Sequence, residues 1–246
     1  TMALLPLAAA ALTAGCGSGS SRTLVPGRIV FETYRDGNGE VYSMNADGSN
    51  PVNLTNNAAY DGEAAATRNG RRIAFSSDRD GNTEIYVINA DGSGQTRLTN
   101  DPARDEEPQW SPDGSRIVFE SFRTGVRHIW SMRSDGSDLR QLTTGATSNW
   151  EPHYSPDGSK IVFGSGRDGN DEIYVMNADG TGVTRLTNNP ADDRNYVWQP
   201  DISVQDIAFQ SNRNGNWDIY IMALDGSNLR QITTDAADDQ YPTWDC

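Results

Sequence analysis

The sequence predicts an all-β protein, a β-propeller built from four-stranded blades around a central axis. Three observations support this prediction: one unit recurs five times, each unit contains four short strand-like segments, and turn signals separate those segments. The recurrence is clearest in an apolar segment that ends in phenylalanine, with spacings of 44, 44, 44 and 46 residues. Its five copies end at Phe31, Phe75, Phe119, Phe163 and Phe209. A period of about 40–45 residues with four strands per unit is typical of propeller blades.

The four strands of a unit are bounded by turn-forming residues. The first is expected at Pro108–Trp110, and it ends at the turn Ser111–Gly114, where Pro presets φ and Gly permits a positive φ. The second is expected over Ile117–Ser121, and the preceding copy shows the third at Ile85–Ile88 and the fourth at Gln95–Thr99. The third strand is apolar at successive positions, which indicates a strand covered on both faces, as in stacked blades. The absence of a 3.6-residue apolar periodicity excludes a helical solenoid.

The repeated region begins and ends at different points of the unit. It enters at residues 26–29, just past a first strand, and residues 241–244 form a first strand that no second strand follows. We therefore expect the C-terminal segment at Thr243 and Trp244 to pair with the opening hairpin at Ile29–Phe31. This pairing would close a ring of five blades and leave no open sheet edge there. The alternative is a six-bladed ring that lacks one blade through truncation.

Composition and charge exclude several classes of function. The chain has 246 residues, with 34 Asp and Glu against 20 Lys and Arg, which gives a net charge of −14. This charge disfavours binding to nucleic acid and to anionic lipid, because both require clustered cations. Two Cys and two His leave little for a zinc site or a His-based catalytic triad. We expect no metal and no cofactor.

The first 25 residues read as an export signal followed by a spacer. Residues 1–15 have the length and composition of a signal peptide, residues 16–25 are a Gly/Ser-rich flexible tether, and the propeller occupies residues 26–246. Leu12–Cys16 resembles the bacterial lipobox, which implies that Cys16 is acylated and anchors the protein to a membrane of the cell envelope. Two departures are the missing basic region and Thr13, where the lipobox usually has Leu. The alternative is an ordinary secretory signal, which would leave Cys16 able to form a disulfide with Cys246.

The repeat itself resembles a known family. Trp110–Phe119, together with Arg79–Asn82 and Ile85–Ser93, is closely similar to the TolB-type propeller repeat, and the resemblance covers residues 26–244. The resemblance implies the propeller fold strongly and function weakly, because TolB-like propellers include periplasmic scaffolds, propeller halves of peptidase-like enzymes and some polysaccharide lyases. TolB itself has a further N-terminal domain and six blades. The chain is therefore expected to be TolB-like without being TolB.

Two columns of residues of opposite charge recur at fixed positions in the unit. The arginines are Arg35, Arg79, Arg123, Arg167 and Arg213. The second column is Asp61, Asp105, Asn149, Asp193 and Asp239. The loop that enters a blade and its second hairpin should lie on the same face, so each Arg can reach an Asp and form a bidentate pair. Because the pattern recurs in every unit, we interpret it as a structural clamp.

A third column lies two residues beyond the Asp column and supplies the candidate binding site. Its members are Glu63, Glu107, Glu151, Asn195 and Tyr241. Three glutamates near the mouth of the central channel would produce a focused negative field that attracts cationic partners. Trp150, Tyr196 and Tyr241 add aromatic surface of the kind enriched at protein interfaces. The alternatives are a docking face for a basic or metal-bearing partner and a merely solvated acidic rim.

Two function classes remain. The favoured hypothesis is a monomeric, envelope-anchored scaffold that binds a protein or a glycan through its acidic loop face and channel mouth. The alternative is an enzyme or an accessory subunit that processes polysaccharide or peptide. The enzyme hypothesis is weaker because the chain shows no Gly-x-Ser-x-Gly elbow in a strand-to-helix context. Its two histidines, His128 and His153, fall at different strand positions in neighbouring copies.

Overall fold

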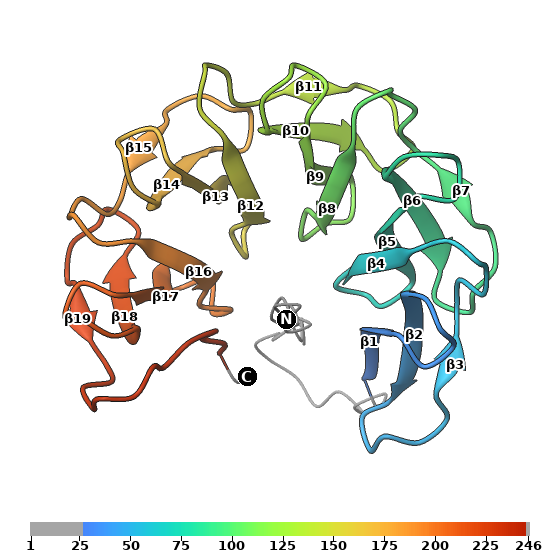
Figure 1. Ribbon diagram of the computed structural model, residues 1–246, viewed down its shortest axis with the longest axis horizontal. Coiled ribbons are helices and arrows are strands. Elements are labelled where there is room, and N and C mark those ends of the chain that lie inside the picture. The colour runs from blue at the N-terminus through green and yellow to red at the C-terminus, as the bar shows by residue number, and fades with distance from the viewer. Residues whose placement is uncertain (1–26, 245–246) are drawn as a thin grey trace, which may run out of the picture.

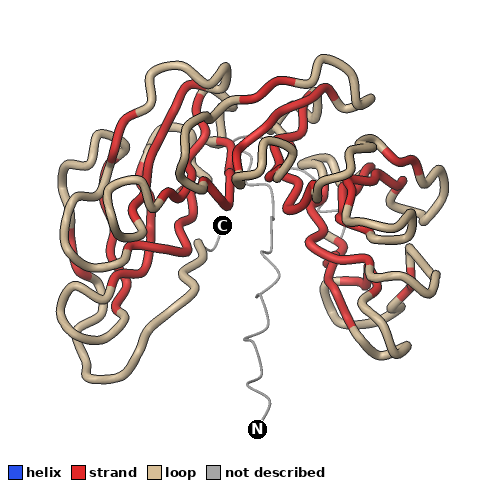
Figure 2. The backbone as a smooth tube through the Cα atoms, turned by 45° about the horizontal axis from the view of Figure 1, so that its top comes forward, coloured by secondary structure: helices blue, strands red, loops and turns tan. Residues whose placement is uncertain are grey.

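The computed structural model describes residues 27–244, and every element in that range is a strand or a loop (Figure 2). The strands form five antiparallel sheets that follow one another in an arc (Figure 1). Five blades are therefore present, as predicted. The predicted signal peptide (1–15), the predicted tether (16–25), the predicted lipidation site Cys16 and Cys246 lie outside the described residues.

Each blade runs from an innermost strand outward. The innermost strands are β4 (Asp61–Ala66), β8 (Asp105–Trp110), β12 (Asn149–Tyr154) and β16 (Asp193–Trp198). The second strands are β1 (Arg28–Thr33), β5 (Arg72–Ser77), β9 (Arg116–Ser121), β13 (Lys160–Ser165) and β17 (Asp206–Ser211). The third strands are β2 (Glu40–Asn45), β6 (Glu84–Asn89), β10 (His128–Arg133), β14 (Glu172–Asn177) and β18 (Asp218–Ala223). The outermost are β3 (Val52–Asn53), β7 (Thr96–Arg97), β11 (Arg140–Gln141), β15 (Thr184–Arg185) and β19 (Arg230–Gln231).

The hydrophobic core lies between neighbouring blades. Phe119 of β9 is fully buried and shares a cluster with Ala65 and Val87 of the preceding blade. Trp110 closes this cluster, and its indole Nε1 donates a hydrogen bond of 3.0 Å to the carbonyl of Ala65. In the three middle blades the second and third strands are covered on both faces because each sheet packs between two neighbours, which explains their continuous apolar runs.

The first blade differs from the others, and the predicted ring closure is wrong for the described structure. The sheet β1–β2–β3 has three strands, and residues 241–244 form no strand. The C-terminal segment is held instead by the last blade: the Tyr241 amide donates to Gln210 Oε1 (3.0 Å), and Trp244 Nε1 donates to the carbonyl of Val197 (3.4 Å). The segment thus follows the path of an innermost strand relative to the blade before it. In Figure 1 it ends across the central opening from β1, so the two cannot pair in this arrangement.

Candidate functional site at the acidic mouth

A β-bulge in each innermost strand fixes the predicted glutamate column. The register of the inner pair shifts at each of these positions, for example between Glu106 and Gln109 in β8. One residue of each of these four bulges has a left-handed backbone: Glu63 (φ 51°), Glu107 (54°), Glu151 (51°) and Asn195 (50°). Tyr241 has the same backbone conformation (φ 58°) although its segment forms no strand. Non-glycine residues in this region cost about 1–3 kcal/mol and persist where the surrounding structure holds them. The bulges therefore set the direction of the column side chains.

Acceptors from the preceding blade bind the backbone amides of the bulges. The Glu107 amide donates to Glu63 Oε2 at 3.0 Å and to Ser76 Oγ at 3.2 Å. The Glu151 amide donates to Glu120 Oε1 at 2.5 Å. These bonds draw carboxylates inward and link one blade to the next. We call the group Glu63, Glu106, Glu107, Glu120 and Glu151 the acidic mouth.

Burial and mutual repulsion raise the pKa values of these carboxyl groups. The pKa of Glu107 rises to about 9, chiefly through burial and then through the negative charges of Glu120, Glu63 and Glu151. Burial raises the pKa of Glu120 to about 7 although Arg127 opposes the rise. Burial also raises the pKa of Glu151. The mouth is therefore a set of partly desolvated carboxyl groups that gain from an approaching positive charge.

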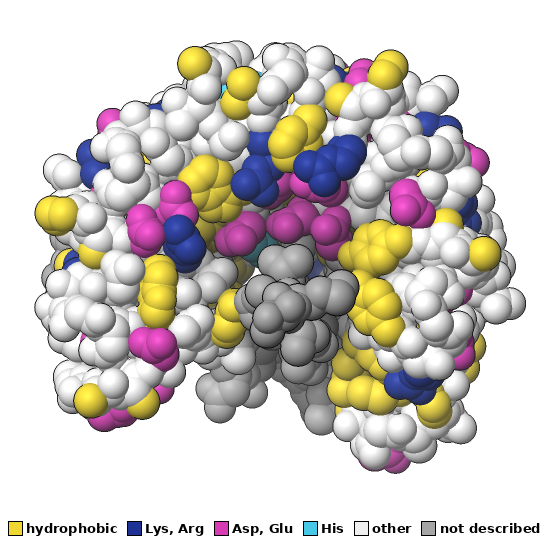
Figure 3. Space-filling view, in the orientation of Figure 1, with side chains coloured by type: hydrophobic (Ala, Val, Ile, Leu, Met, Phe, Trp, Pro, Cys, Tyr) yellow, Lys and Arg dark blue, Asp and Glu magenta, His cyan; other side chains and the backbone are white. Residues whose placement is uncertain are grey.

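Two cations and two aromatic rings lie along the rim of the acidic mouth. Arg104 lies over the Phe122 ring, 4.6 Å from its centroid, and Arg127 lies 5.9 Å from the same ring and 5.5 Å from the Trp150 ring. Figure 3 shows hydrophobic and cationic side chains alternating above a group of acidic ones on this face. We call Arg104, Phe122, Arg127 and Trp150 the cation–aromatic ladder.

The three aromatic residues proposed for the site from sequence have different environments. Trp150 is half-buried in the ladder, and Tyr241 is 45% exposed. Tyr196 is 4% exposed, and its hydroxyl donates to the backbone carbonyls of Trp150 (2.9 Å) and Glu151 (2.7 Å). The expectation that Tyr196 offers surface to a partner is therefore wrong: its ring belongs to the core, and its hydroxyl supports the bulge.

His153 also lies near the mouth. Its ring meets Tyr196 edge-on at 6.0 Å, and burial lowers its pKa to about 4. The ring is therefore neutral at physiological pH and adds no positive charge to the mouth.

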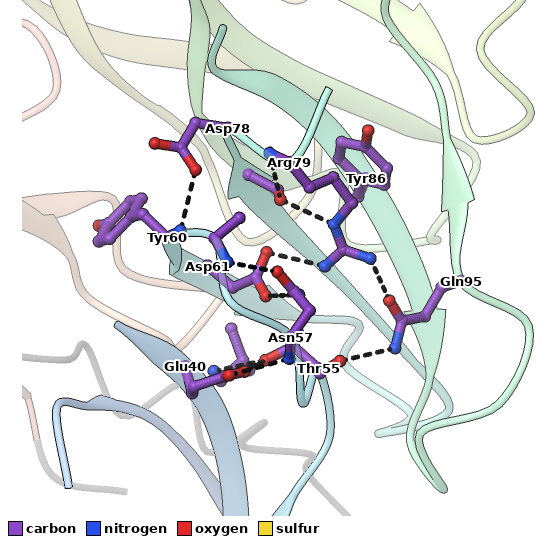
Figure 4. A network of polar contacts seen from close by, with 12 residues as sticks. Glu40, Thr55, Asn57, Tyr60, Asp61, Asp78, Arg79, Tyr86 and Gln95 are labelled. Carbon is purple, nitrogen blue, oxygen red and sulfur yellow. Dashed lines mark hydrogen bonds and ion pairs between the residues drawn. The ribbon is translucent and has the colours of Figure 1, made fainter. Parts of the chain in front are cut away.

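In three blades the arginine of the column forms the expected ion pair with the aspartate of the same blade. The contacts are Arg79–Asp61 (2.8 Å), Arg123–Asp105 (2.6 Å) and Arg213–Asp193 (2.9 Å). Figure 4 shows the first, where Asp61 also accepts from Asn57, and Gln95 bridges Arg79 and Thr55. Each contact uses one guanidinium nitrogen, so the expected bidentate geometry is not observed. In the fourth blade Arg167 bonds the neutral amide of Asn149 at 2.6 Å.

The fifth pair, Arg35 with Asp239, is not formed. Arg35 donates to Thr33 Oγ1 (3.2 Å) and lies 4.6 Å from the Tyr42 ring centroid. One carboxylate oxygen of Asp239 is buried without a hydrogen-bond partner among the described residues. The absence of the Arg35 ion pair follows from the missing strand pairing in the first blade.

Sequence reasoning did not identify Glu120 or three ladder members, Arg104, Phe122 and Arg127, as site residues. Glu120 lies on a second strand, and only the bond to the next blade reveals that it faces the mouth. The repeat carried a signal for the ladder members, because they stand at positions that vary between copies. The residues equivalent to Arg127, for example, are Gly39, Thr83, Asp171 and Trp217.

Across residues 27–244, no three His, Cys, Asp or Glu side chains are arranged to hold a metal ion together. In the same range no helix is long and apolar enough to cross a membrane.

Fold and site together define a class: a five-bladed, all-β propeller whose innermost strands present acidic side chains at the centre. A family model described as the TolB beta propeller domain matches residues 68–163 and 145–246, which is more than half of the chain. The chain therefore belongs to the TolB β-propeller family. None of the curated proteins compared with it matches.

Several solved structures share the fold. A putative TolB from Agrobacterium tumefaciens is 26% identical, with a TM-score of 0.68 over 78% of this chain and 73% of that one. TolB from Acinetobacter baumannii is 21% identical, with a TM-score of 0.70 over 87% and 54%. A puromycin hydrolase is 17% identical, with a TM-score of 0.69 over 86% and 37%. The chain thus spans about half of the Acinetobacter protein and just over a third of the hydrolase, and these two likenesses show the fold alone.

Proposed function

We propose that the protein is an exported scaffold whose acidic mouth holds a basic segment of a partner protein. The observation that carries the proposal is the convergence of column glutamates from three consecutive blades, Glu63, Glu107 and Glu151, on left-handed bulges. A cleft lined by one sign of charge focuses the field and raises the local concentration of oppositely charged groups. Burial strengthens the attraction, because screening by solvent is weaker there.

The location and form of the scaffold belong to the same proposal. The signal-like residues 1–15 and Cys16 support export to the bacterial cell envelope with a lipid anchor, and the likeness to two TolB structures agrees with an envelope role. We expect a monomer without catalytic activity of its own, one that acts by holding its partner near the membrane.

Affinity capture from solubilised envelope tests the proposal. The bait is the wild-type protein or a variant with Glu63→Gln, Glu107→Gln and Glu151→Gln. The expected result is a specific partner that the wild type retains and the variant loses.

A matched control carries Asp91→Asn, Asp135→Asn and Asp225→Asn, which convert the same number of carboxyl groups to amides in exposed turns at the other end of the blades. Asn keeps the acceptor that these turns use. The control is expected to capture the partner as the wild type does. Equal capture by the glutamate variant would contradict the acidic mouth as the docking site, and turnover of a peptide or glycan by the wild type would contradict the absence of catalysis.

A further inference from the structure

The ladder residues are departures from an otherwise regular repeat. Phe122 replaces Tyr34, Asp78, Gly166 and Asn212 of the other copies, and Trp150 replaces Gly62, Glu106, Arg194 and Gln240. In a repeat protein, the residues shared by all copies maintain the blade, so residues that one region alone carries need another explanation. These departures lie on the rim of the acidic mouth. The last blade has a reversed pair at the positions equivalent to Trp150 and Arg127, where Arg194 lies 5.7 Å from the Trp217 ring.

One departure is physically coupled to another. The position of Gly164 in β13 holds Glu32, Ser76, Glu120 or Gln210 in the other copies. A Cβ atom at Gly164 would lie 2.3 Å from Trp150 Nε1, a distance that real Cβ atoms do not show. Gly164 therefore makes the room that the Trp150 indole occupies. Two matched changes that place one large aromatic ring at the rim indicate a surface adapted to a contact.

The ladder is preorganised and still has donors to offer. Arg127 is held by Phe122, Trp150 and an ion pair with Glu120 at 3.0 Å. The side chain of Arg104 is 56% exposed, and its ion pair with Glu106 is longer, at 3.5 Å. A guanidinium carries five N–H donors, so both side chains retain N–H groups that can bind carbonyl oxygens.

The charges beside the ladder favour one kind of occupant. Both ladder cations already face a carboxylate, Glu106 or Glu120, while Glu107 and Glu151 have no ion pair among the described residues. A free anion would meet the surplus of carboxylates, whereas a positive side chain would complete the pairing. The ring faces of Phe122 are approached by guanidinium groups, so its remaining surface suits apolar side chains better than a stacked sugar.

We propose that the cation–aromatic ladder is the contact surface for an extended polypeptide segment with one basic side chain between apolar ones. The basic side chain enters beside Glu107 and Glu151, backbone carbonyls accept hydrogen bonds from Arg104 and Arg127, and the apolar neighbours contact Phe122 and Trp150. This inference rests on the proposed function and adds to it the form of the partner and the residues that select it. Aromatic residues and Arg of this kind dominate the energetics of protein interfaces.

Selection from a displayed library of random dodecapeptides tests the inference directly. The baits are the wild type, Phe122→Ala, Arg104→Ala and the control Arg133→Ala, which removes an exposed cation at the far end of the same blade. Matched melting temperatures show that each variant is folded. The wild type and the control are expected to enrich peptides with Lys or Arg flanked by apolar residues. Synthetic versions of these peptides are expected to bind each ladder variant at least about tenfold more weakly.

The outcomes separate the inference from the proposed function. Enriched basic peptides that bind the ladder variants within twofold of wild type would overturn the ladder's role, while loss of binding in the triple glutamate variant would still support the acidic mouth. Enrichment of acidic peptides, or no enrichment at all, would overturn the inference itself. Retention of the basic peptides by the triple glutamate variant would contradict the proposed function.

Discussion

Strands β1 and β9 compare the same sequence in two environments. Their sequences, RIVFET and RIVFES, differ only in the last residue. In β9 every residue after Arg116 is buried, whereas no residue of β1 is fully buried. The difference lies in their neighbours, because β9 pairs with the innermost strand β8, whereas in the first blade only β2 pairs with β1. Burial here is a property of the assembled blade and is not encoded by the strand.

The clamp follows the same rule. Arg123 meets the buried carboxylate of Asp105 at 2.6 Å because β8 brings that Asp to the loop. Arg35 occupies the same position in the repeat, but within residues 27–244 it contacts Thr33 and the rings of Phe31 and Tyr42 and forms no ion pair. Arg123 also lies over two rings, those of Phe119 and Trp130, so the two arginines share their ring contacts and differ in the ion pair.

The largest expected effect is the loss of a core phenylalanine. Phe119→Ala should lower the free energy of unfolding by about 3–5 kcal/mol, the usual cost for a fully buried Phe, while Phe31→Ala should cost about half as much because its ring is only partly buried. Urea denaturation of both variants measures the difference. Equal losses would indicate that β1 is as well covered in solution as β9, and the contrast between the two blades would fail.

Substitutions of the clamp arginines should lower the free energy of unfolding by smaller amounts that differ from blade to blade. Arg123→Ala leaves the buried Asp105 carboxylate unpaired and should cost about 3 kcal/mol. Arg167→Ala removes a partner from the neutral amide of Asn149 and should cost about 1 kcal/mol. Arg35→Ala, which breaks no ion pair among the described residues, should cost less than either.

Thermal and urea unfolding of the three arginine variants test that order. Arg123→Lys is the matched control, because it keeps the positive charge and loses the planar guanidinium geometry. If Arg35→Ala proved as destabilising as Arg123→Ala, Arg35 would have a carboxylate partner that the described arrangement does not contain.

The fold was predictable from sequence because the determinants of a blade are local and repeated. Turn residues such as Pro112 and Gly114, and the recurring Phe119, define strands at a fixed period, and five copies of one pattern reinforce one another. The Arg–Asp clamp was predictable for the same reason. Ring closure was not, because it depends on the angle between successive blades, and small angular differences summed over five blades decide whether the ends meet.

The site was predictable only in part. The column of Glu63, Glu107 and Glu151 could be read from the repeat, but the left-handed bulges that aim these side chains depend on how an inner strand pairs with its neighbour. Tyr196 was misplaced because an aromatic residue beside a glutamate column can face either side of a bulged strand. The ladder could not be predicted from the shared pattern of the repeat, because its members differ between copies.

A pH-dependent effect concerns the proton on Glu107, which has no counterpart in the first blade because no described inner strand pairs with β1. The unfolded chain releases this proton near pH 4.3, whereas burial and neighbouring carboxylates raise the folded-state pKa to about 9. The contribution of the protonated Glu107 carboxyl group to the free energy of unfolding is therefore fully present below about pH 4. It is lost as the pH rises through about 9. Because Gln resembles the protonated carboxyl, Glu107→Gln should match wild type at pH 4.5 and should exceed its free energy of unfolding by a margin that grows as the pH rises to 9. Urea titrations at pH 4.5, 7 and 9 measure this, with Asp135→Asn as control, since hydrogen bonds from Ser137 lower the pKa of Asp135 and so the control gains nothing at high pH. A difference that stays constant across this range would mean that the carboxyl group titrates alike in both states, and the mouth would then be too well solvated to attract a basic segment strongly.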